Sequence, residues 1–138
     1  MHWVLIVICY PSNLNNNCEL DPSKWPQILL FDSLKIVEKE SLFITKMIEF
    51  VQWQWYLHTS ADFEFARQIK GIVPDVVKQT NSKDCGIFLL QYAESFLKEI
   101  NRYRGSPPIK HDYRSLIDKS IIRSKREQII DVLLDLAI

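Results

Sequence analysis

A short polar segment, residues 79–86, leads directly into the most strongly patterned apolar stretch of the chain. The apolar residues that follow first occupy nearly every face of a helix and then settle onto one face: Ile87, Phe88, Leu89, Leu90, Tyr92, Ala93, Phe96, Leu97 and Ile100. This pattern predicts a helix whose front end is deeply buried, with Ser82 or Asp84 as its N-cap. Cys85 falls in the first turn, where unpaired N–H groups and the helix dipole favour a thiolate and lower the pKa of the thiol.

Taken alone, Cys85 is better explained as a small buried hydrophobic residue, so a catalytic role requires partners. A nucleophilic thiol needs an imidazole to take its proton and an acid to hold that imidazole. His2 precedes an unbroken apolar run at residues 3–10, and Asp32 follows a second run at residues 28–31. If the two runs are neighbouring antiparallel strands, the start of one lies beside the end of the other, and His2 lies beside Asp32. The alternative is a strand-end histidine and a turn aspartate without chemistry.

The order of His2, Asp32, Gln79 and Cys85 resembles the ubiquitin-like-protein proteases that process SUMO, the sentrin-specific cysteine protease family. The similarity runs from His2 through the C-terminal helix. The amino-acid sequence of residues 78–86 is most similar to that of the divergent, chain-editing branch of the family. The resemblance implies an α+β fold with a papain-like cysteine protease core, in which a mixed sheet packs against a central helix bearing the nucleophile and against further helices.

The resemblance also implies a role for each residue of the set. His2 takes the proton from Cys85 and returns it to the leaving amine, while Asp32 holds the imidazole in one tautomer. The side-chain amide of Gln79 and the backbone N–H of Cys85 stabilise the oxyanion. Trp3 matches one of two tryptophans that form a slot too narrow for a Cβ atom, so we expect it to bind a Gly-Gly tail.

These roles predict a cysteine isopeptidase that cleaves SUMO after its C-terminal Gly-Gly and removes SUMO or SUMO chains from lysines. The expected partners are SUMO and SUMO-conjugated proteins, and the resemblance implies a nuclear location, with a cytoplasmic one left open. Two alternatives stand beside this: a truncated homologue that only binds, and an acyltransferase or protease for another ubiquitin-like tail that uses the same triad. We expect residues 1–138 to form the C-terminal portion of such a catalytic domain, with the upstream part and the second tryptophan missing. Where the branch often carries a proline, two residues before the glutamine, this chain has Val77.

Composition narrows the classes of partner. The chain has 138 residues, of which 47% are hydrophobic, and this describes one globular domain with enough material for a core. Basic and acidic residues number 17 each, so the net charge gives no reason to expect nucleic acid or an anionic membrane as a partner. Cys9, Cys18 and Cys85 lack a Cys-x-x-Cys spacing, which argues against a disulfide framework and a structural zinc site. We therefore expect no metal and no cofactor, and the oligomeric state stays open.

The remaining elements are predicted from periodicity and capping signals. Helical spacing predicts a helix at about residues 41–57, and a capping box from Ser124 to Glu127 predicts the start of a last helix that packs on the core. A short helix at residues 61–70 is expected to close at Gly71. Polar loops are expected at residues 11–26 and 102–110.

Overall fold

The computed structural model describes residues 2–15, 25–36, 42–59, 69–102, 112–117 and 119–137. Cys18, the helix expected at residues 61–70 and the loop expected at 102–110 lie wholly or largely outside these residues. The chain forms two compact units, each described here by itself. The sheet unit comprises residues 6–30 and 36–74, and the thiol unit comprises residues 1–5, 31–35 and 75–138.

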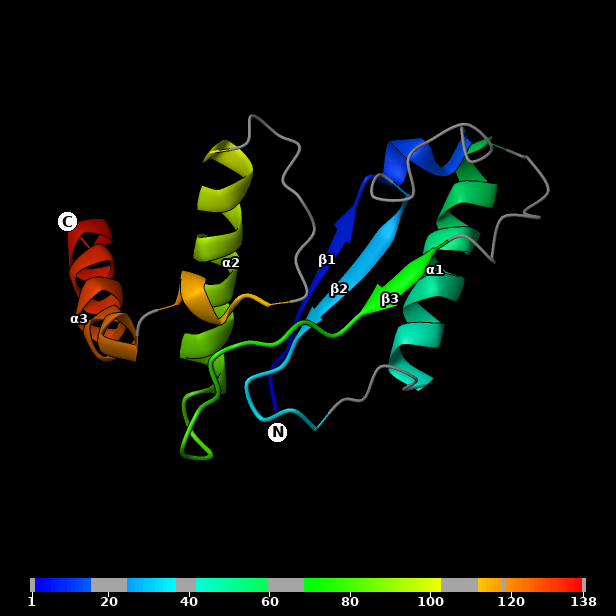
Figure 1. Cartoon of the computed structure of the whole chain (residues 1–138). Helices are drawn as coiled ribbons and strands as arrows, with labels where there is room; N and C mark the ends of the chain where they lie inside the picture. Colours follow the sequence, from blue (N-terminus) through cyan, green and yellow to red (C-terminus); the bar gives the residue numbers. More distant parts are fainter. Residues whose placement is uncertain are drawn as a thin grey trace. The chain divides into compact units, whose positions relative to one another are not determined.

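A three-stranded sheet, in the order β1-β2-β3, is built from the apolar runs predicted as strands. Its strands are β1 (Leu5–Cys9), β2 (Gln27–Phe31) and β3 (Lys70–Ile72). β2 pairs with β3 in parallel, with Gln27 opposite Lys70, and Figure 1 shows β1 running in the opposite direction to β2. Every residue of β2 is buried, and all but the first, Gln27, are apolar, as expected of a central strand. The mixed sheet of the predicted α+β fold is confirmed.

In the sheet unit, helix α1 (Leu42–Thr59) lies beside β3 (Figure 1). A buried apolar cluster joins the elements of this unit, with further residues packed against it: Leu14, Ile28, Val51 and Ile69, and Ile6, Met47, Ile48 and Trp55. Gly71 lies within β3, so its predicted role as a helix-closing residue is wrong. A Cβ atom at this position would collide with Cγ2 of Ile44 on α1. Glycine is therefore required by the close approach of helix and strand.

The thiol unit contains the long helices α2 (Cys85–Arg102) and α3 (Lys119–Leu136), which contact each other. Its core is a group of buried aromatic rings around Phe31, the last residue of β2. The ring of Phe31 lies with its centroid 5.8 Å from Tyr92, 6.0 Å from Phe96 and 5.1 Å from Tyr113. The edge-to-face and tilted geometries of these pairs are those that aromatic rings prefer. Within the thiol unit, the cluster holds Phe31 against α2.

Helix α3 departs from the sequence prediction in two ways. It begins at Lys119, five residues before Ser124, so the expected capping box lies inside the helix. The hydroxyl of Ser124 instead donates to the carbonyl of Ile121 at 3.1 Å, the back-bonding that mid-helix serines adopt. The expectation that α3 packs on the core is wrong for its second half, whose large apolar residues are exposed: Ile130, Val132, Leu133, Leu134 and Leu136.

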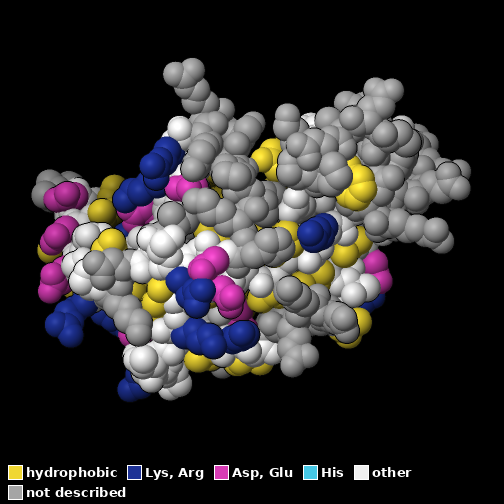
Figure 2. Space-filling view, in the orientation of Figure 1, with side chains coloured by type: hydrophobic (Ala, Val, Ile, Leu, Met, Phe, Trp, Pro, Cys, Tyr) yellow, Lys and Arg dark blue, Asp and Glu magenta, His cyan; other side chains and the backbone are white. Residues whose placement is uncertain are grey.

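Surface charges of opposite sign lie close together. Figure 2 shows Lys and Arg side chains beside Asp and Glu side chains. Exposed pairs such as Lys46 with Glu49 at 2.6 Å and Arg114 with Asp112 at 2.5 Å belong to this pattern. Among the described residues, no helix has the length and apolar character needed to cross a membrane.

Candidate active site

The start of α2 is fixed by a short hydrogen-bonded loop, which makes Cys85 its first residue. The backbone N–H of Phe88 donates to the carbonyl of Asp84 at 2.9 Å, which opens the helix. Asn81 holds the loop ahead of it, because its side-chain oxygen accepts from the N–H groups of Lys83 and Asp84 at 2.9 and 3.0 Å. Its side-chain nitrogen donates to the Asp84 carboxylate at 2.8 Å. Cys85 is buried at the end of this ordered loop.

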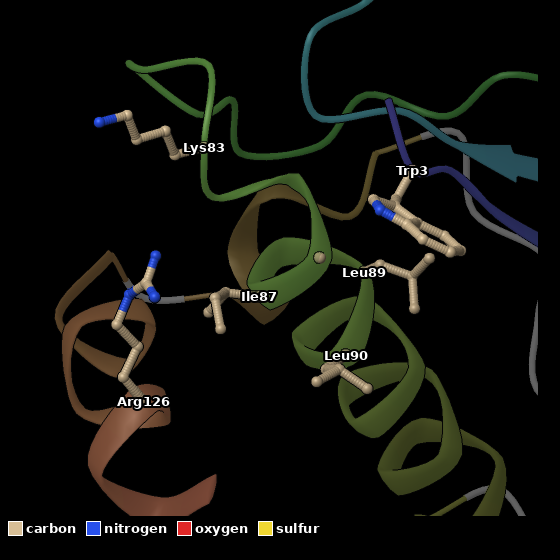
Figure 3. A pocket seen from close by; sticks show the side chains of 7 residues that line it. Trp3, Lys83, Ile87, Leu89, Leu90 and Arg126 are labelled. Carbon is tan, nitrogen blue, oxygen red and sulfur yellow. The ribbon is translucent and has the colours of Figure 1, made fainter. Parts of the chain in front are cut away.

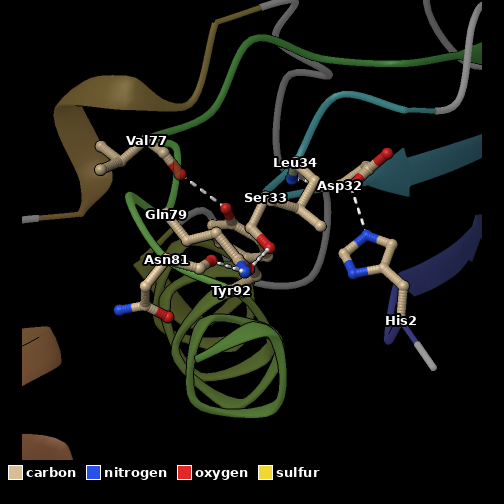
Figure 4. A network of polar contacts seen from close by, with 8 residues as sticks. All are labelled: His2, Asp32, Ser33, Leu34, Val77, Gln79, Asn81 and Tyr92. Atoms are coloured by element: carbon tan, nitrogen blue, oxygen red, sulfur yellow. Dashed lines mark hydrogen bonds and ion pairs between the residues drawn. The ribbon is translucent and has the colours of Figure 1, made fainter. Parts of the chain in front are cut away.

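The structure brings His2 and Asp32 together, as the expected strand order predicts. Nε2 of His2 lies 2.6 Å from Oδ1 of Asp32, whose side chain is fully buried. The same carboxylate oxygen accepts the backbone N–H of Leu34 at 2.9 Å (Figure 4). Since that N–H can only donate, it fixes Oδ1 as an acceptor for the imidazole. The other ring nitrogen of His2, Nδ1, is buried and has no hydrogen-bond partner among the described residues.

Interactions within the site shift the pKa values of Cys85 and His2 in opposite directions. The pKa of the Cys85 thiol is lowered, first by a hydrogen bond from the backbone of Trp3, then by the interaction with His2 and by the backbone of Gly86, which together outweigh the effect of burial. Burial acts to lower the pKa of His2, but the interactions with Asp32 and Cys85 outweigh it and raise the value. A lowered thiol pKa beside a raised imidazole pKa shifts the proton equilibrium toward the thiolate–imidazolium pair. Nδ1 of His2 is the nitrogen left to exchange a proton with the thiol.

Gln79 is buried close to the nucleophile's loop and is held by three hydrogen bonds. Its side-chain nitrogen donates to the carbonyl of Asn81 at 2.5 Å, and its side-chain oxygen accepts from the hydroxyl of Ser33 (Figure 4). Its backbone N–H donates to the carbonyl of Ser33 at 3.1 Å. An amide nitrogen carries two donors, and only one is used by Asn81. Among the described residues the second has no hydrogen-bond partner, which suits it to bind a developing negative charge.

Trp3 lies beside the nucleophile with its ring exposed. The residue is 57% exposed and lines a pocket of about 400 Å³ together with Gly86, the residue after Cys85 (Figure 3). The other lining residues are apolar side chains of α2 and two cationic ones: Ile87, Leu89, Leu90, Lys83 and Arg126. A pocket with an apolar wall next to a thiol is suited to hold the chain end that the thiol attacks.

All five predicted site residues therefore lie in the thiol unit, but the prediction missed three contributors. Ser33 and Asn81 bind the side chain of Gln79, and the backbone N–H of Trp3 is the strongest influence on the thiol. The carbonyl of Asn81 and the N–H of Trp3 are backbone groups, which every residue type carries, so the sequence could not indicate their roles. Ser33 had a sequence signal, because it directly follows the candidate acid. Within the described residues, no group of three or more metal-binding side chains is found.

The sequence matches the Ulp1 protease family, C-terminal catalytic domain, over residues 1–133. The chain belongs to this family. Among similar proteins, Sentrin-specific protease 7 of Homo sapiens is 31% identical over 118 residues, which cover 82% of this chain and 10% of the relative. Probable ubiquitin-like-specific protease 2B of Arabidopsis thaliana is 36% identical over 106 residues, covering 72% of this chain and 11% of the relative. The resemblance to SUMO-processing proteases is confirmed.

A solved structure supports the fold. The crystal structure of the de-sumoylating protease matches with a TM-score of 0.68 and 21% identity, over 96% of this chain and 51% of that chain. The predicted papain-like α+β core is thus confirmed. The chain spans about a tenth of the length of the curated relatives it matches and about half of the solved one.

Proposed function

We propose that this chain carries the catalytic residues of a cysteine isopeptidase that cleaves SUMO after its C-terminal glycine. The observation that carries the proposal is the contact of His2 with the buried Asp32 carboxylate, next to a thiol with a lowered pKa; the second ring nitrogen of His2 is unpaired within the described structure. Membership of a protease family supports the same chemistry. The hydrogen-bond pattern gives base, orienting acid and nucleophile a defined residue each.

The reaction is an acyl transfer in two steps. The Cys85 thiolate attacks the carbonyl carbon of the last glycine, while His2, as imidazolium, protonates the leaving lysine amine. The oxyanion that forms accepts from the free N–H of the Gln79 amide and from the backbone N–H of Cys85. Water then attacks the thioester, His2 takes a proton from that water, and the thiol is released with the SUMO carboxylate. Asp32 stays ionised throughout and stabilises the imidazolium.

The substrate class is proposed from the relatives and from the pocket. Relatives described as sentrin-specific and a fold neighbour described as de-sumoylating point to SUMO rather than ubiquitin. Trp3 is exposed and lines the pocket, and we propose that its ring covers the extended Gly-Gly tail of the substrate. SUMO and SUMO-conjugated proteins are accordingly the proposed partners, and a nuclear location is proposed with them. Imaging of the tagged full-length protein checks that location.

An activity-based trap tests the proposal. SUMO, ubiquitin and an acetyl donor, each carrying an electrophile in place of the scissile carbonyl, are incubated with the protein and with its Cys85→Ala variant. We expect the SUMO trap alone to label the wild-type protein, at Cys85, as identified by peptide mass spectrometry. Labelling by the ubiquitin trap or the acetyl donor instead would replace SUMO with another acyl group, and labelling of the Cys85→Ala variant at equal rate would contradict the assigned nucleophile.

A further inference from the structure

We propose that Ser33 is a positioning residue that fixes the orientation of the Gln79 amide in the oxyanion site. The inference rests on the proposed function, because it assigns a role within the same reaction. Ser33 is 1% exposed and Gln79 is 7% exposed, so their contact is shielded from water. No other hydroxyl is described as bonding to the Gln79 side chain in the part of the chain that the structure covers.

The partners determine which end of the amide faces which way. The backbone carbonyl of Asn81 can only accept a hydrogen bond, so it must face Nε2 of Gln79. Oε1 then faces Ser33, whose hydroxyl is able to rotate and donate to it. The two hydrogen bonds hold the nitrogen and the oxygen of the amide and thereby define its plane.

The hydrogen bonds to Asn81 and Ser33 determine where the second N–H of Gln79 points. With one hydrogen of Nε2 on Asn81, the planarity of the amide leaves a single direction for the other. If the Ser33 hydroxyl is removed, the amide is held at one end only and Oε1 is left as a buried acceptor without its partner. The side chain can then rotate about the remaining bond, and the oxyanion donor loses its fixed direction.

Ser33 is bound to Gln79 through its main chain as well. The N–H of Gln79 donates to the carbonyl of Ser33 at 3.1 Å, a contact that any residue at position 33 can make. A substitution at Ser33 therefore keeps the backbone contact and removes only the side-chain contact. This makes the role of the hydroxyl experimentally separable.

The test compares Ser33→Ala with wild type on a SUMO substrate bearing a C-terminal fluorogenic amide. A misdirected donor acts on charge that appears in the transition state, so we expect kcat to fall by about 10- to 100-fold with KM nearly unchanged. In the Gln79→Ala background, Ser33→Ala should cause no further loss. Alkylation of Cys85 by iodoacetamide forms no oxyanion, so its rate should be unchanged by Ser33→Ala. Ser33→Thr retains the hydroxyl and should recover most of kcat where the protein stays folded, as checked by thermal unfolding.

Three results would overturn the proposal: a loss in alkylation equal to the loss in kcat, independent losses in the double variant, or a wild-type kcat for Ser33→Ala. A measurement that does not depend on catalysis is NMR of the two side-chain N–H protons of Gln79. We expect the chemical shifts of both protons to change in Ser33→Ala, because Oε1 of the same amide loses its hydrogen bond; unchanged shifts would be a fourth result against the proposal. If wild-type protein cleaves no SUMO substrate while the NMR change is seen, the proposed function fails and the positioning role stands.

Discussion

Replacing Asp32 by asparagine separates the charge of the acid from its geometry. Both the imidazole of His2 and the backbone N–H of Leu34 bond to the same oxygen, Oδ1. An asparagine oxygen in that place accepts both bonds, and the Leu34 N–H opposes the flipped amide because two donors would then face each other. The variant should therefore keep the tautomer of His2 while the negative charge is lost.

The size of the effect follows from that contact. A hydrogen bond to a charged group contributes about 1.5–3 kcal/mol, against about 0.5–1.5 kcal/mol for a neutral one. The difference of about 1–1.5 kcal/mol corresponds to about 10-fold in rate, and the Coulomb attraction lost with it brings the expected loss in kcat/KM to at most about 10²-fold. Loss of the correct tautomer costs about 10⁴-fold in a Ser-His-Asp triad, so the two outcomes are well separated.

The assay is kcat/KM on the fluorogenic SUMO substrate as a function of pH, with Asp32→Ala as the comparison. Burial lowers the pKa of His2, and without the charge of Asp32 this effect gains weight, so the pKa falls. The alkaline limb of the pH profile reports loss of the imidazolium and should move to lower pH in Asp32→Asn. Asp32→Ala leaves the Leu34 N–H and His2 Nε2 without this partner and should lose more activity. Wild-type kcat/KM in Asp32→Asn, or a loss as large as 10⁴-fold, would refute the reasoning.

Three further predictions concern the thiols, the oxyanion and the glycines. Alkylation of Cys85 should titrate below the ordinary cysteine range because its pKa is lowered, whereas Cys9, whose pKa burial raises to about 11, should react only at alkaline pH; equal midpoints by mass spectrometry would contradict this. Gln79→Ala should reduce kcat by about 10²–10³-fold with KM close to unchanged, and an effect confined to KM would assign Gln79 to tail binding instead. Gly71→Ala should lower the free energy of unfolding by about 1–3 kcal/mol through its collision with Ile44, while Gly86→Ala, with no atom within 4 Å of the added carbon, should not lower it in denaturant titrations.

The sequence was informative about the site wherever connectivity alone decides position. His2 and Asp32 flank two apolar runs, and pairing of those runs as neighbouring strands leaves the two residues side by side. Cys85 was placed by the switch from polar loop to apolar helix, a change that is visible in residue types. These predictions required only the period of each element and the order of the elements along the chain.

The sequence was poor where a tertiary contact overrides a local signal. Ser124 and Glu127 have the spacing of a capping box, yet α3 begins upstream at Lys119, because no residue between Lys119 and Ser124 stops a helix. Gly71 has the position of a helix-closing glycine, and only the approach of Ile44 reveals its packing role. Capping and glycine patterns are local, and so they cannot report which distant element lies against them.

Asp32 and Ser33 are adjacent in the sequence and contact two different residues of the site. Phe31 packs against aromatic neighbours on α2, and the chain turns directly after it, because the N–H of Lys35 donates to the carbonyl of Asp32 at 3.3 Å. In this turn Asp32 bonds to His2, and Ser33 bonds to Gln79 (Figure 4). One pair of adjacent residues thereby holds both the base and the oxyanion donor, and the distance between them is set by a single peptide unit. A shift of this turn by one residue would take both side chains away from their partners, so the packing of Phe31 matters as much to the chemistry as to the fold.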